Sequence, residues 1–320
     1  MQKILIIRLS SIGDIVLTSP IIRCLKSQLN SCIHYLVKDK YKIVIESNPY
    51  IDHIISVKRI SEPIIKKLKL ENYDLIIDLQ NNFSSFILKL RLGIKSYTVN
   101  KKNWQKLLFI YCGLELLKGH VVDRYFACVN KMGVYDDNQG LDYFLASNID
   151  FDYGLSLNQK FIVWSIGGSF INKQLSSAQI IEVCNVLNDT IVLLGGENEK
   201  KMGLDIVHKS NNKQIHNFCG KLTLNQSAYL IKKSHLVLTN DTGLMHIATA
   251  FKKSIISFWG CTKPKLGFSP NLMGYKCVEI VANPTHNPCS KHGNRCKLTR
   301  DGCVKQINSK LIIEAVKNHI

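Results

Sequence analysis

The feature that most constrains the fold is a repeated alternation of short apolar segments with longer amphipathic ones. In the first half, segments rich in β-branched residues are separated by stretches with helical spacing, such as 20–29 and 63–70. Strands that alternate with helices pair in parallel, so this half is predicted to be an open α/β domain. The strands expected in it are Lys3–Leu9, His34–Val37, His53–Val57 and Leu75–Leu79.

The same alternation returns after a polar segment over 146–160, which is typical of a linker. Two α/β domains are therefore predicted, residues 1–152 and residues 153–320. Such domains bind ligands outside the carboxyl ends of their strands, so we expect a site in a cleft between them, built by the loops 10–14, 167–173, 195–199 and 240–243. The strands of the second half are expected to begin at residues 161, 190, 235, 254 and 277.

The turn Asn240-Asp241-Thr242-Gly243 joins an apolar strand to a new helix. Asp and Thr favour helix starts, where free backbone N–H groups and a partial positive charge suit an anion such as phosphate. Two interpretations stay open. The turn either only caps the helix or also holds a diphosphate.

Composition narrows the class of protein. The chain has 320 residues, 46% of them apolar, and a formal net charge of +18, which favours an anionic partner. The charge is spread over both halves without a basic tail, so no nucleic-acid partner is expected. No apolar run reaches the roughly 18 residues of a membrane span. The odd number of cysteines, 11, favours the reducing cytoplasm.

Two nucleotide-binding signatures are missing, G-x-G-x-x-G and the phosphate loop G-x-x-x-x-G-K-[ST]. One D-x-D sequence, Asp150-Phe151-Asp152, could hold a divalent cation, but it falls in the polar linker rather than after a buried strand. No metal is therefore expected there.

Asp14 follows the first expected strand closely. There its carboxylate could accept a proton from a hydroxyl nucleophile. The alternative is that Asp14 only caps a helix that begins at Ile15. The local pattern leaves both interpretations open.

Three stretches together resemble one known family, the ADP-heptose:lipopolysaccharide heptosyltransferases. They are "RLSSIGDIVLTSPIIRCLK" from Arg8, "GGENEK" from Gly195 and the segment 220–264 that contains "NDTGLMHIA". The resemblance implies the GT-B fold, two Rossmann-like doubly wound domains facing a cleft. It also implies an acceptor-binding first domain, a donor-binding second domain, and an inverting transfer without a metal cofactor.

For the donor, the resemblance implies that Thr242, Gly243 and Lys173 bind the diphosphate and that Asp241 binds the sugar hydroxyls. His246 would lie beside the donor, and Glu197 would bind the ribose. Ser169 and Ser165 are further candidates for phosphate contacts.

For the acceptor, the resemblance implies Asp14 as the general base, with Ser11 and Gly13 beside it. Arg124 is a candidate for a carboxylate or phosphate of the acceptor, because guanidinium binds either in a bidentate manner. An ion pair of Arg124 with Asp123 or another surface acid is the alternative. Lys101, Lys102 and Lys106 could line the acceptor side or face an anionic membrane.

The sequence departs from the family in two places. "NKQLSS" replaces the usual aromatic continuation after the loop lysine, which puts the donor geometry around Lys173 in doubt. Phe83 and Ser84 stand where the family commonly has an arginine, which puts the identity of the acceptor in doubt.

A cluster near the end of the chain has the spacing H-x2-C-x6-C-x6-C, formed by His286, Cys289, Cys296 and Cys303. Four N/S ligands could form a structural zinc site, although the spacing lacks the paired C-x2-C of common zinc motifs. A structural loop without metal is the alternative, and the prediction made here is no metal.

The predicted function is a cytoplasmic glycosyltransferase, associated peripherally with the inner membrane, that transfers heptose from an ADP-sugar donor to a lipid-linked acceptor of the lipopolysaccharide inner core (lipid A-Kdo type). Alternatives are a related glycosyltransferase with another nucleotide-sugar or acceptor, and a catalytically silent nucleotide-sugar-binding module.

Overall fold

The computed structural model describes residues 1–147, 149, 159–270 and 276–319. The chain divides into two compact units, one formed by Met1–Asn103 and Gly119–Ala146, the other by Trp104–Lys118 and Ser147–Ile320. The predicted domain boundary at residue 152, most of the expected linker and the Asp150-Phe151-Asp152 sequence lie outside the described residues.

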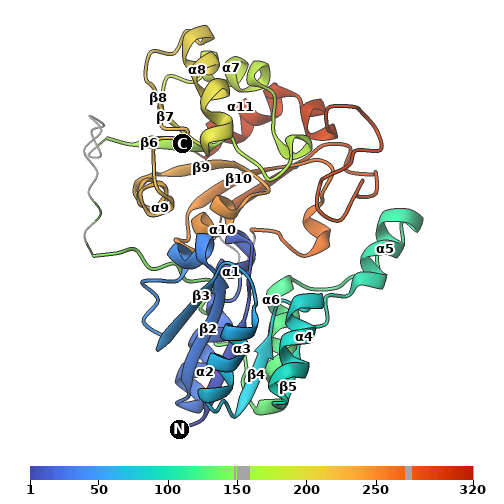
Figure 1. The fold of residues 1–320 in the computed structure, drawn as a ribbon. Coiled ribbons are helices and arrows are strands. Elements are labelled where there is room, and N and C mark those ends of the chain that lie inside the picture. The colour runs from blue at the N-terminus through green and yellow to red at the C-terminus, as the bar shows by residue number, and fades with distance from the viewer. Residues whose placement is uncertain (148, 150–158, 271–275, 320) are drawn as a thin grey trace. The chain divides into compact units, whose positions relative to one another are not determined.

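The first unit is built on a five-stranded sheet in the order β3-β2-β1-β4-β5 (Figure 1). All its strand pairs are parallel. The central strand β1 is continuously apolar and buried after its first residue, Lys3, as is typical of a parallel sheet that helices cover on both faces. The strands are β1 (Lys3–Ile7), β2 (Cys32–Lys38), β3 (His53–Val57), β4 (Leu75–Asp78) and β5 (Ser96–Thr98).

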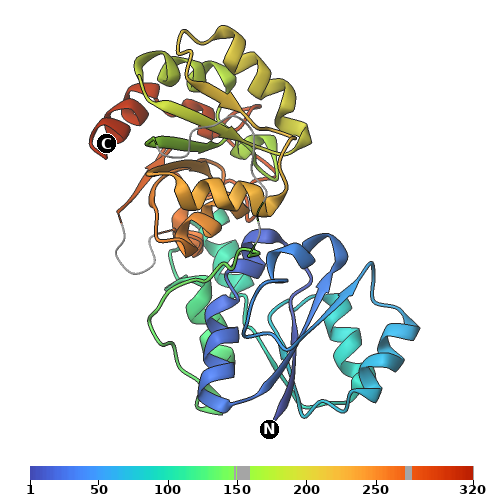
Figure 2. The same ribbon diagram turned by 90° about the vertical axis from the view of Figure 1, so that its left-hand side faces the viewer.

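Helices flank this sheet on both faces, as Figure 2 shows. One layer contains α2 and α6, which contact each other, and the other contains α3 and α4. The buried side chains between sheet and helices include Leu5, Leu36, Ile76 and Leu88. The helices are α1 (Ile12–Val16), α2 (Ser19–Leu29), α3 (Glu62–Leu70), α4 (Phe83–Leu92) and α6 (Val121–Val129).

The second unit is built on a six-stranded sheet in the order β11-β10-β9-β6-β7-β8, again with parallel pairs throughout. Its first strand in the chain, β6, lies next to the second and the fourth, as in dinucleotide-binding folds. The strands are β6 (Phe161–Ser165), β7 (Thr190–Leu194), β8 (Ile215–Asn217), β9 (Leu236–Asn240), β10 (Ser254–Trp259) and β11 (Cys277–Val281).

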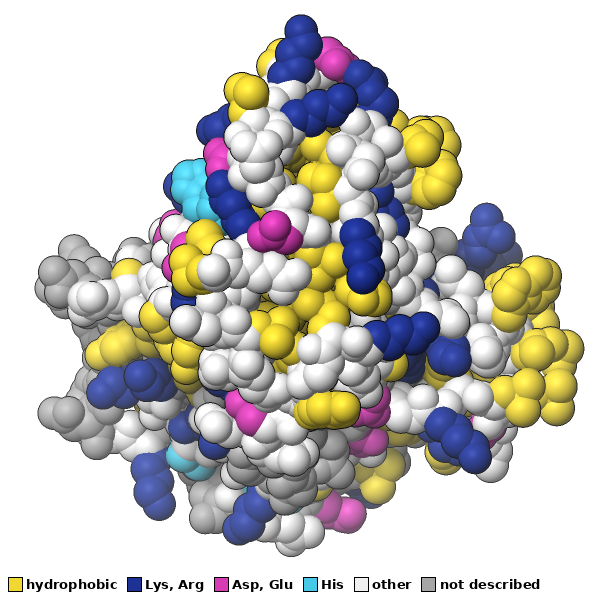
Figure 3. Space-filling view, turned by 90° about the horizontal axis from the view of Figure 1, so that it is seen from below, with side chains coloured by type: hydrophobic (Ala, Val, Ile, Leu, Met, Phe, Trp, Pro, Cys, Tyr) yellow, Lys and Arg dark blue, Asp and Glu magenta, His cyan; other side chains and the backbone are white. Residues whose placement is uncertain are grey.

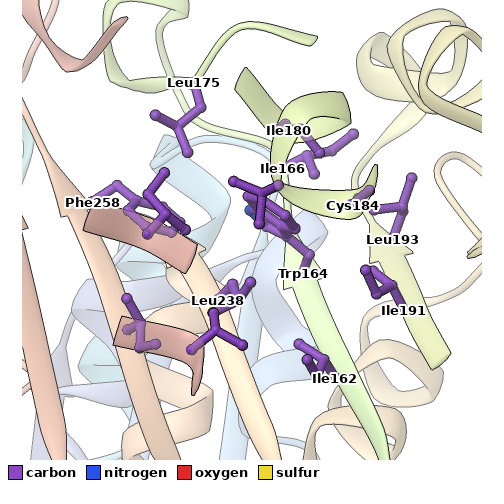
Figure 4. Close-up of a cluster of buried hydrophobic side chains, with 14 of the residues drawn as sticks. Ile162, Trp164, Ile166, Leu175, Ile180, Cys184, Ile191, Leu193, Leu238 and Phe258 are labelled. Atoms are coloured by element: carbon purple, nitrogen blue, oxygen red, sulfur yellow. The ribbon is translucent and has the colours of Figure 1, made fainter. Parts of the chain in front are cut away.

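Helices α7, α8 and α11 cover one face of this sheet, and α9 and α10 cover the other (Figure 1). Trp164 and Phe258 lie at the centre of the core under the first layer, with ring centroids 6.1 Å apart (Figure 4). The helices of this unit are α5 (Asn103–Cys112), of which all but the first residue belong to it, α7 (Ser177–Val186), α8 (Lys200–Lys209), α9 (Leu224–Lys233), α10 (Gly243–Ala250) and α11 (Ser309–Lys317).

The predicted α/β class with two doubly wound sheets is confirmed, and most expected strands agree within two residues. Two short strands, β5 and β8, were not expected. The turn at 240–243 needs a correction, because Asn240 is the last residue of β9. Among the described residues, no helix is both long and apolar enough to cross a membrane.

Candidate functional site

Each sheet has a switch point, where connections from neighbouring strands leave toward opposite faces. It lies between β1 and β4 in the first unit and between β6 and β9 in the second. Ligands of open α/β sheets bind beyond the carboxyl ends of the strands at such points. Asp14 comes from the segment that follows β1, and Lys173 and Asp241 follow β6 and β9. The main predicted site residues thus lie at the two switch points.

At the first switch point, Arg8 organises the loop after β1. Its guanidinium is buried and lies 2.8 Å from Asp14 Oδ1, while Nε donates to Ser10 O and Nη1 donates to Leu79 O. Burial disfavours the guanidinium charge, yet the interactions with Tyr125 and Asp14 raise the pKa of Arg8 above its ordinary value. Arg8 is therefore a fixed cation that connects the ends of β1 and β4. Arg8 was not among the predicted site residues.

Asp14 is the third residue of α1, which begins at Ile12 and not at Ile15 as expected. Its Oδ2 accepts from Ser11 Oγ at 2.8 Å and from Ser11 N at 3.3 Å, so the carboxylate does help to cap its helix. The side chain is 27% exposed, which leaves it accessible to solvent. Capping and proton acceptance are compatible, because part of the carboxylate stays exposed. Gly13 is buried in the same turn.

A buried carboxylate, Asp78, fixes the neighbouring loop after β4. Its Oδ1 accepts from the backbone N of Gln80 and Asn81, and its Oδ2 accepts from Ser85 Oγ and pairs with Lys89 Nζ at 2.8 Å. All these partners are internal, so we assign Asp78 a structural role. It holds the loop that leads into α4.

Arg124 is buried in α6, and its Nη2 donates to Gly119 O at 3.3 Å. Burial lowers the pKa of its guanidinium. The carboxylate of Asp123 accepts from His120 N at 2.6 Å, where it caps α6. Arg124 is therefore buried within the first unit, and its role toward an acceptor stays a prediction.

The second switch point brings together residues of three loops. Lys173, in the 3-10 turn Ile171–Lys173, places Nζ 2.6 Å from Asp241 Oδ2, and Thr262 Oγ1 donates to the same oxygen at 2.8 Å. The Lys173 and Asp241 side chains are only 11% and 13% exposed. Lys173 and Asp241 were predicted site residues. Thr262 was not, because nothing in "GCTKP" distinguishes it from an ordinary loop threonine.

Beside this pair, α10 begins at Gly243 with Thr242 as its N-cap. The Thr242 side chain makes no capping hydrogen bond to the helix, and its Oγ1 lies 3.4 Å from Thr239 Oγ1. The N–H groups of the first turn are thus not covered by that side chain, which is the arrangement that suits an anion. His246 is buried one turn further along α10.

Asn240 connects the two strands of this switch point. Its side chain is fully buried, and Nδ2 donates to Ile166 O at 3.0 Å and to Gly167 O at 2.9 Å. The loop that leads to Lys173 is therefore tied to the end of β9. Asn240 was expected to be part of the polar turn, and its bridging position is new.

The remaining donor candidates differ in exposure. Glu197 is 71% exposed and pairs with Lys200 at 3.2 Å, and Ser169 is exposed as well. Ser165 is buried at the end of β6. Glu199, from the same "GGENEK" motif, is buried and accepts from Gly196 N and Gln174 Nε2, so it fixes the loops around Glu197. The ribose and phosphate contacts of Glu197, Ser165 and Ser169 stay predictions.

Two predicted positions need correction. His286 is exposed and does not join the cysteine cluster, whose fourth member is Cys261. Cys261 lies two residues after the end of β10, far from the other three cysteines in the sequence. Lys106 is buried with its Nζ 5.3 Å from the Phe268 ring centroid, so it does not face a membrane.

Solved structures with a similar fold include two heptosyltransferases from E. coli. The chain superposes on the E. coli ADP-heptose lipopolysaccharide heptosyltransferase II with a TM-score of 0.73 at 21% identity, covering 99% of this chain and 98% of that one. It superposes on the E. coli heptosyltransferase WaaC with ADP with a TM-score of 0.71 at 17% identity, covering 100% of both chains. The chain thus has the GT-B fold, with two Rossmann-like domains.

Sequence comparison gives the family. The model of glycosyltransferase family 9 (heptosyltransferase) matches residues 62–299. The chain belongs to this family and is a glycosyltransferase. A relative named lipopolysaccharide heptosyltransferase 1, from Campylobacter coli, is 23% identical over 352 aligned positions that cover 99% of this chain and 98% of the relative. The predicted family is confirmed.

Proposed function

We propose that this glycosyltransferase transfers heptose from ADP-heptose to a sugar of the lipopolysaccharide inner core. The relative from Campylobacter coli is named a lipopolysaccharide heptosyltransferase, and the WaaC structure is described with ADP, which supports the proposal. The observation that carries the proposal is the arrangement at the second switch point, where a lysine, a carboxylate and a helix start meet.

At the donor, the diphosphate would lie at the start of α10, within reach of Lys173. The N–H groups of the first turn and the ammonium group stabilise the charge that develops on the leaving diphosphate as the glycosidic bond breaks. Asp241 holds Lys173 in place at 2.6 Å and offers an acceptor to the hydroxyls of the sugar.

At the acceptor, Asp14 would accept the proton of the attacking hydroxyl. The hydroxyl oxygen forms the new bond to the anomeric carbon, the bond to the diphosphate breaks, and the configuration inverts. Arg8 and Ser11 orient the carboxylate. In this proposal Lys173 and the helix start neutralise the diphosphate, so the transfer itself needs no metal. Adding Mg²⁺ or Mn²⁺ is expected to leave the rate unchanged.

Asp14→Asn tests the proposal directly. We expect loss of about 10²–10⁴-fold in kcat, which is the usual contribution of a general base, with ADP binding retained. The assay measures release of ADP from ADP-heptose in the presence of a deacylated inner-core acceptor.

Asp123→Asn is the matched control, because Asp123 also accepts from the backbone at the start of its helix, at 2.6 Å from His120 N. It should cost stability without the loss in kcat. If Asp14→Asn keeps full activity, the assignment of the base is wrong. If the unmodified protein binds ADP-heptose but releases no ADP with any acceptor, the chain is a binding module.

A different acceptor is the alternative that a specific observation favours. Phe83, at the start of α4, is highly exposed, and Phe83 and Ser84 stand in the neighbourhood where the family commonly has an arginine. Turnover with ADP-heptose but not with inner-core acceptors would support this alternative.

We also propose that the protein associates with the cytoplasmic face of the inner membrane. Helix α5 is amphipathic, since Phe109 and Ile110 are buried while Trp104 and Tyr111 are 79% and 72% exposed. Figure 3 shows hydrophobic side chains gathered at the right-hand edge, the side on which Figure 1 places α5. Exposed aromatic residues on a chain of net charge +18 suit an anionic lipid surface.

A further inference from the structure

Four cysteines from separate parts of the second unit converge on one point. Cys261 follows β10, and Cys289, Cys296 and Cys303 come from the segment between β11 and the 3-10 helix that begins at Cys303. Their sulfur atoms all lie within 4.8 Å of one another. Three pairs are separated by 3.6 Å (Cys261 and Cys303), 3.9 Å (Cys289 and Cys303) and 4.0 Å (Cys289 and Cys296).

These separations exclude a disulfide and match a metal centre. A disulfide requires about 2.0 Å between sulfur atoms. Four thiolates placed tetrahedrally around Zn²⁺ at about 2.3 Å have sulfur atoms about 3.8 Å apart. Tetrahedral sets of four sulfur ligands are typical of zinc or of iron–sulfur centres, and a group of four cysteines without open positions is typical of structural zinc.

We propose that Cys261, Cys289, Cys296 and Cys303 bind one structural Zn²⁺ ion. The proposal differs from the sequence-based candidate set, since Cys261 takes the place of His286. It does not depend on the activity proposed above.

The surroundings of the cluster suit a bound ion. Four thiolates with Zn²⁺ carry a net charge of −2, and the segment between Cys289 and Cys303 contains four basic residues against one acid, Asp301. The backbone N of Thr299 donates to Cys296 Sγ at 3.4 Å, which is the kind of outer-shell contact that orients a metal ligand. The basic residues are Lys291, Arg295, Lys297 and Arg300.

The loop that carries three of the cysteines contains no regular secondary structure, although backbone hydrogen bonds join Cys289 and Ser290 to Cys261. Residues 282–302 contain no helix or strand, and loops longer than about 12–15 residues without secondary structure are uncommon in compact domains. Leu298, a large apolar residue of this loop, is exposed. A metal ion that binds Cys289, Cys296 and Cys303 to Cys261 would add a strong restraint to this loop, because metal-binding energy becomes folding energy.

The same loop packs against the segment that carries Lys173. Gly293 has a φ of +79°, and a Cβ atom there would lie 2.6 Å from Lys173 Cγ. Gly302 has a φ of +94°, and a Cβ atom there would lie 2.5 Å from Asn172 Cα. The fourth cysteine is linked to Asp241, because Thr262 follows Cys261 directly and its Oγ1 donates to Asp241 Oδ2. The ion would therefore position both residues of the Lys173–Asp241 pair.

The primary test is the metal content of the purified full-length chain, by mass spectrometry of the elements. We expect one zinc per chain, and X-ray absorption at the zinc edge should show four sulfur neighbours. Cys289→Ser and Cys303→Ser should lose the zinc. Cys184→Ser, which changes another buried cysteine of the same unit, and His286→Ala should keep it.

The metal content of the unmodified chain tests the proposal even if a variant does not fold. A chain free of metal after purification with added zinc, a nitrogen ligand at the zinc, or iron in place of zinc would each overturn the assignment. So would a disulfide among the four cysteines in the protein kept under reducing conditions.

The positioning role has a readout of its own, trypsin cleavage after Lys291, Arg295 and Lys297. Removing zinc with a strong chelator should speed this cleavage at least tenfold, and adding zinc back should reverse the effect. Equal cleavage with and without zinc would contradict the role in ordering the loop. Weaker ADP binding on zinc removal is also expected, and only this last readout rests on the proposed function.

Discussion

Lys173 and Asp241 form a nearly buried ion pair, with Nζ 2.6 Å from Oδ2, between the loops that follow β6 and β9. In the proposed mechanism Lys173 binds the diphosphate, and the pair would orient its ammonium group before a donor binds. Thr262 shares the same carboxylate oxygen and completes the arrangement. Preorganised charge of this kind stabilises a transition state without a further cost of ordering.

Replacing Lys173 should therefore damage the chemical step. We expect Lys173→Met to lower kcat/KM by about 10²–10³-fold, the usual effect of removing one charge-stabilising donor. Lys209→Met is the control, because Lys209 forms an exposed pair with Asp205 at 2.7 Å, and it should change kcat/KM by less than about twofold. A Lys173→Met enzyme with full kcat/KM in the ADP-release assay would refute this role.

Asn240 should matter more for stability than its turn-like sequence indicates. Asn240→Leu removes both donors to Ile166 O and Gly167 O, and we expect a loss of about 2–4 kcal/mol in the free energy of unfolding, measured in urea. Asn212→Leu is a matched control. Asn212 also bridges two carbonyls but is partly exposed, so water can replace it, and a loss of about 1 kcal/mol or less is expected. Equal losses would contradict the special role of Asn240.

His34 should make the protein less stable in mild acid. Burial and then the Lys3 ammonium lower the pKa of His34, while Glu71 and Asp52 act in the opposite direction and His53 in the same one. Below about pH 6.5, the ordinary pKa of histidine, His34 binds a proton more readily in the unfolded chain than in the native one. The contribution of His34 to stability therefore decreases as the pH falls below about 6.5 and does not change above it.

The variant His34→Gln tests this dependence, since glutamine can still bond to the Tyr73 hydroxyl. We expect its free energy of unfolding to change less than that of the unmodified protein between about pH 7.5 and about pH 5. His286→Gln, at an exposed histidine, should keep the original dependence. An unchanged slope in His34→Gln would assign the acid sensitivity to another group.

The exposed face of α5 should mediate binding to lipid. Trp104→Ser with Tyr111→Ser is expected to weaken binding to vesicles that contain phosphatidylglycerol by at least tenfold, measured by co-sedimentation. The control pair Tyr135→Ser and Leu311→Ser removes comparably exposed side chains outside α5. Equal weakening in both pairs, or equal binding to neutral vesicles, would exclude α5 as the specific contact.

The sequence predicted the sheets well because long apolar strands carry a strong local signal. β1 after Lys3 and β6 before Ser165 are unbroken runs of buried apolar residues. β5 and β8 have only three residues each and are partly exposed, so their sequences carry almost no such signal.

Candidate site residues were predicted where they belong to a continuous sequence motif. They were missed where only the folded sheet brings residues from distant parts of the chain together. Lys173 and Asp241 came from motifs, whereas Arg8, Asn240 and Thr262 act through partners that only the folded sheet brings near. The cysteine cluster is the clearest case. His286 is near the cysteines in sequence, but the fourth residue of the cluster is Cys261, from the loop after β10.

The second unit includes the segment Trp104–Lys118 with most of α5, which lies in the sequence between the two segments of the first unit. Lys106 lies over Phe268, Lys297 Nζ donates to Ile110 O, and Lys265 pairs with Glu115. One proteolytic cut after residue 150 would therefore not yield two intact halves. The carboxyl-terminal fragment would lack a helix it packs against, and the amino-terminal fragment would carry that helix with Phe109 and Ile110 stripped of their cover.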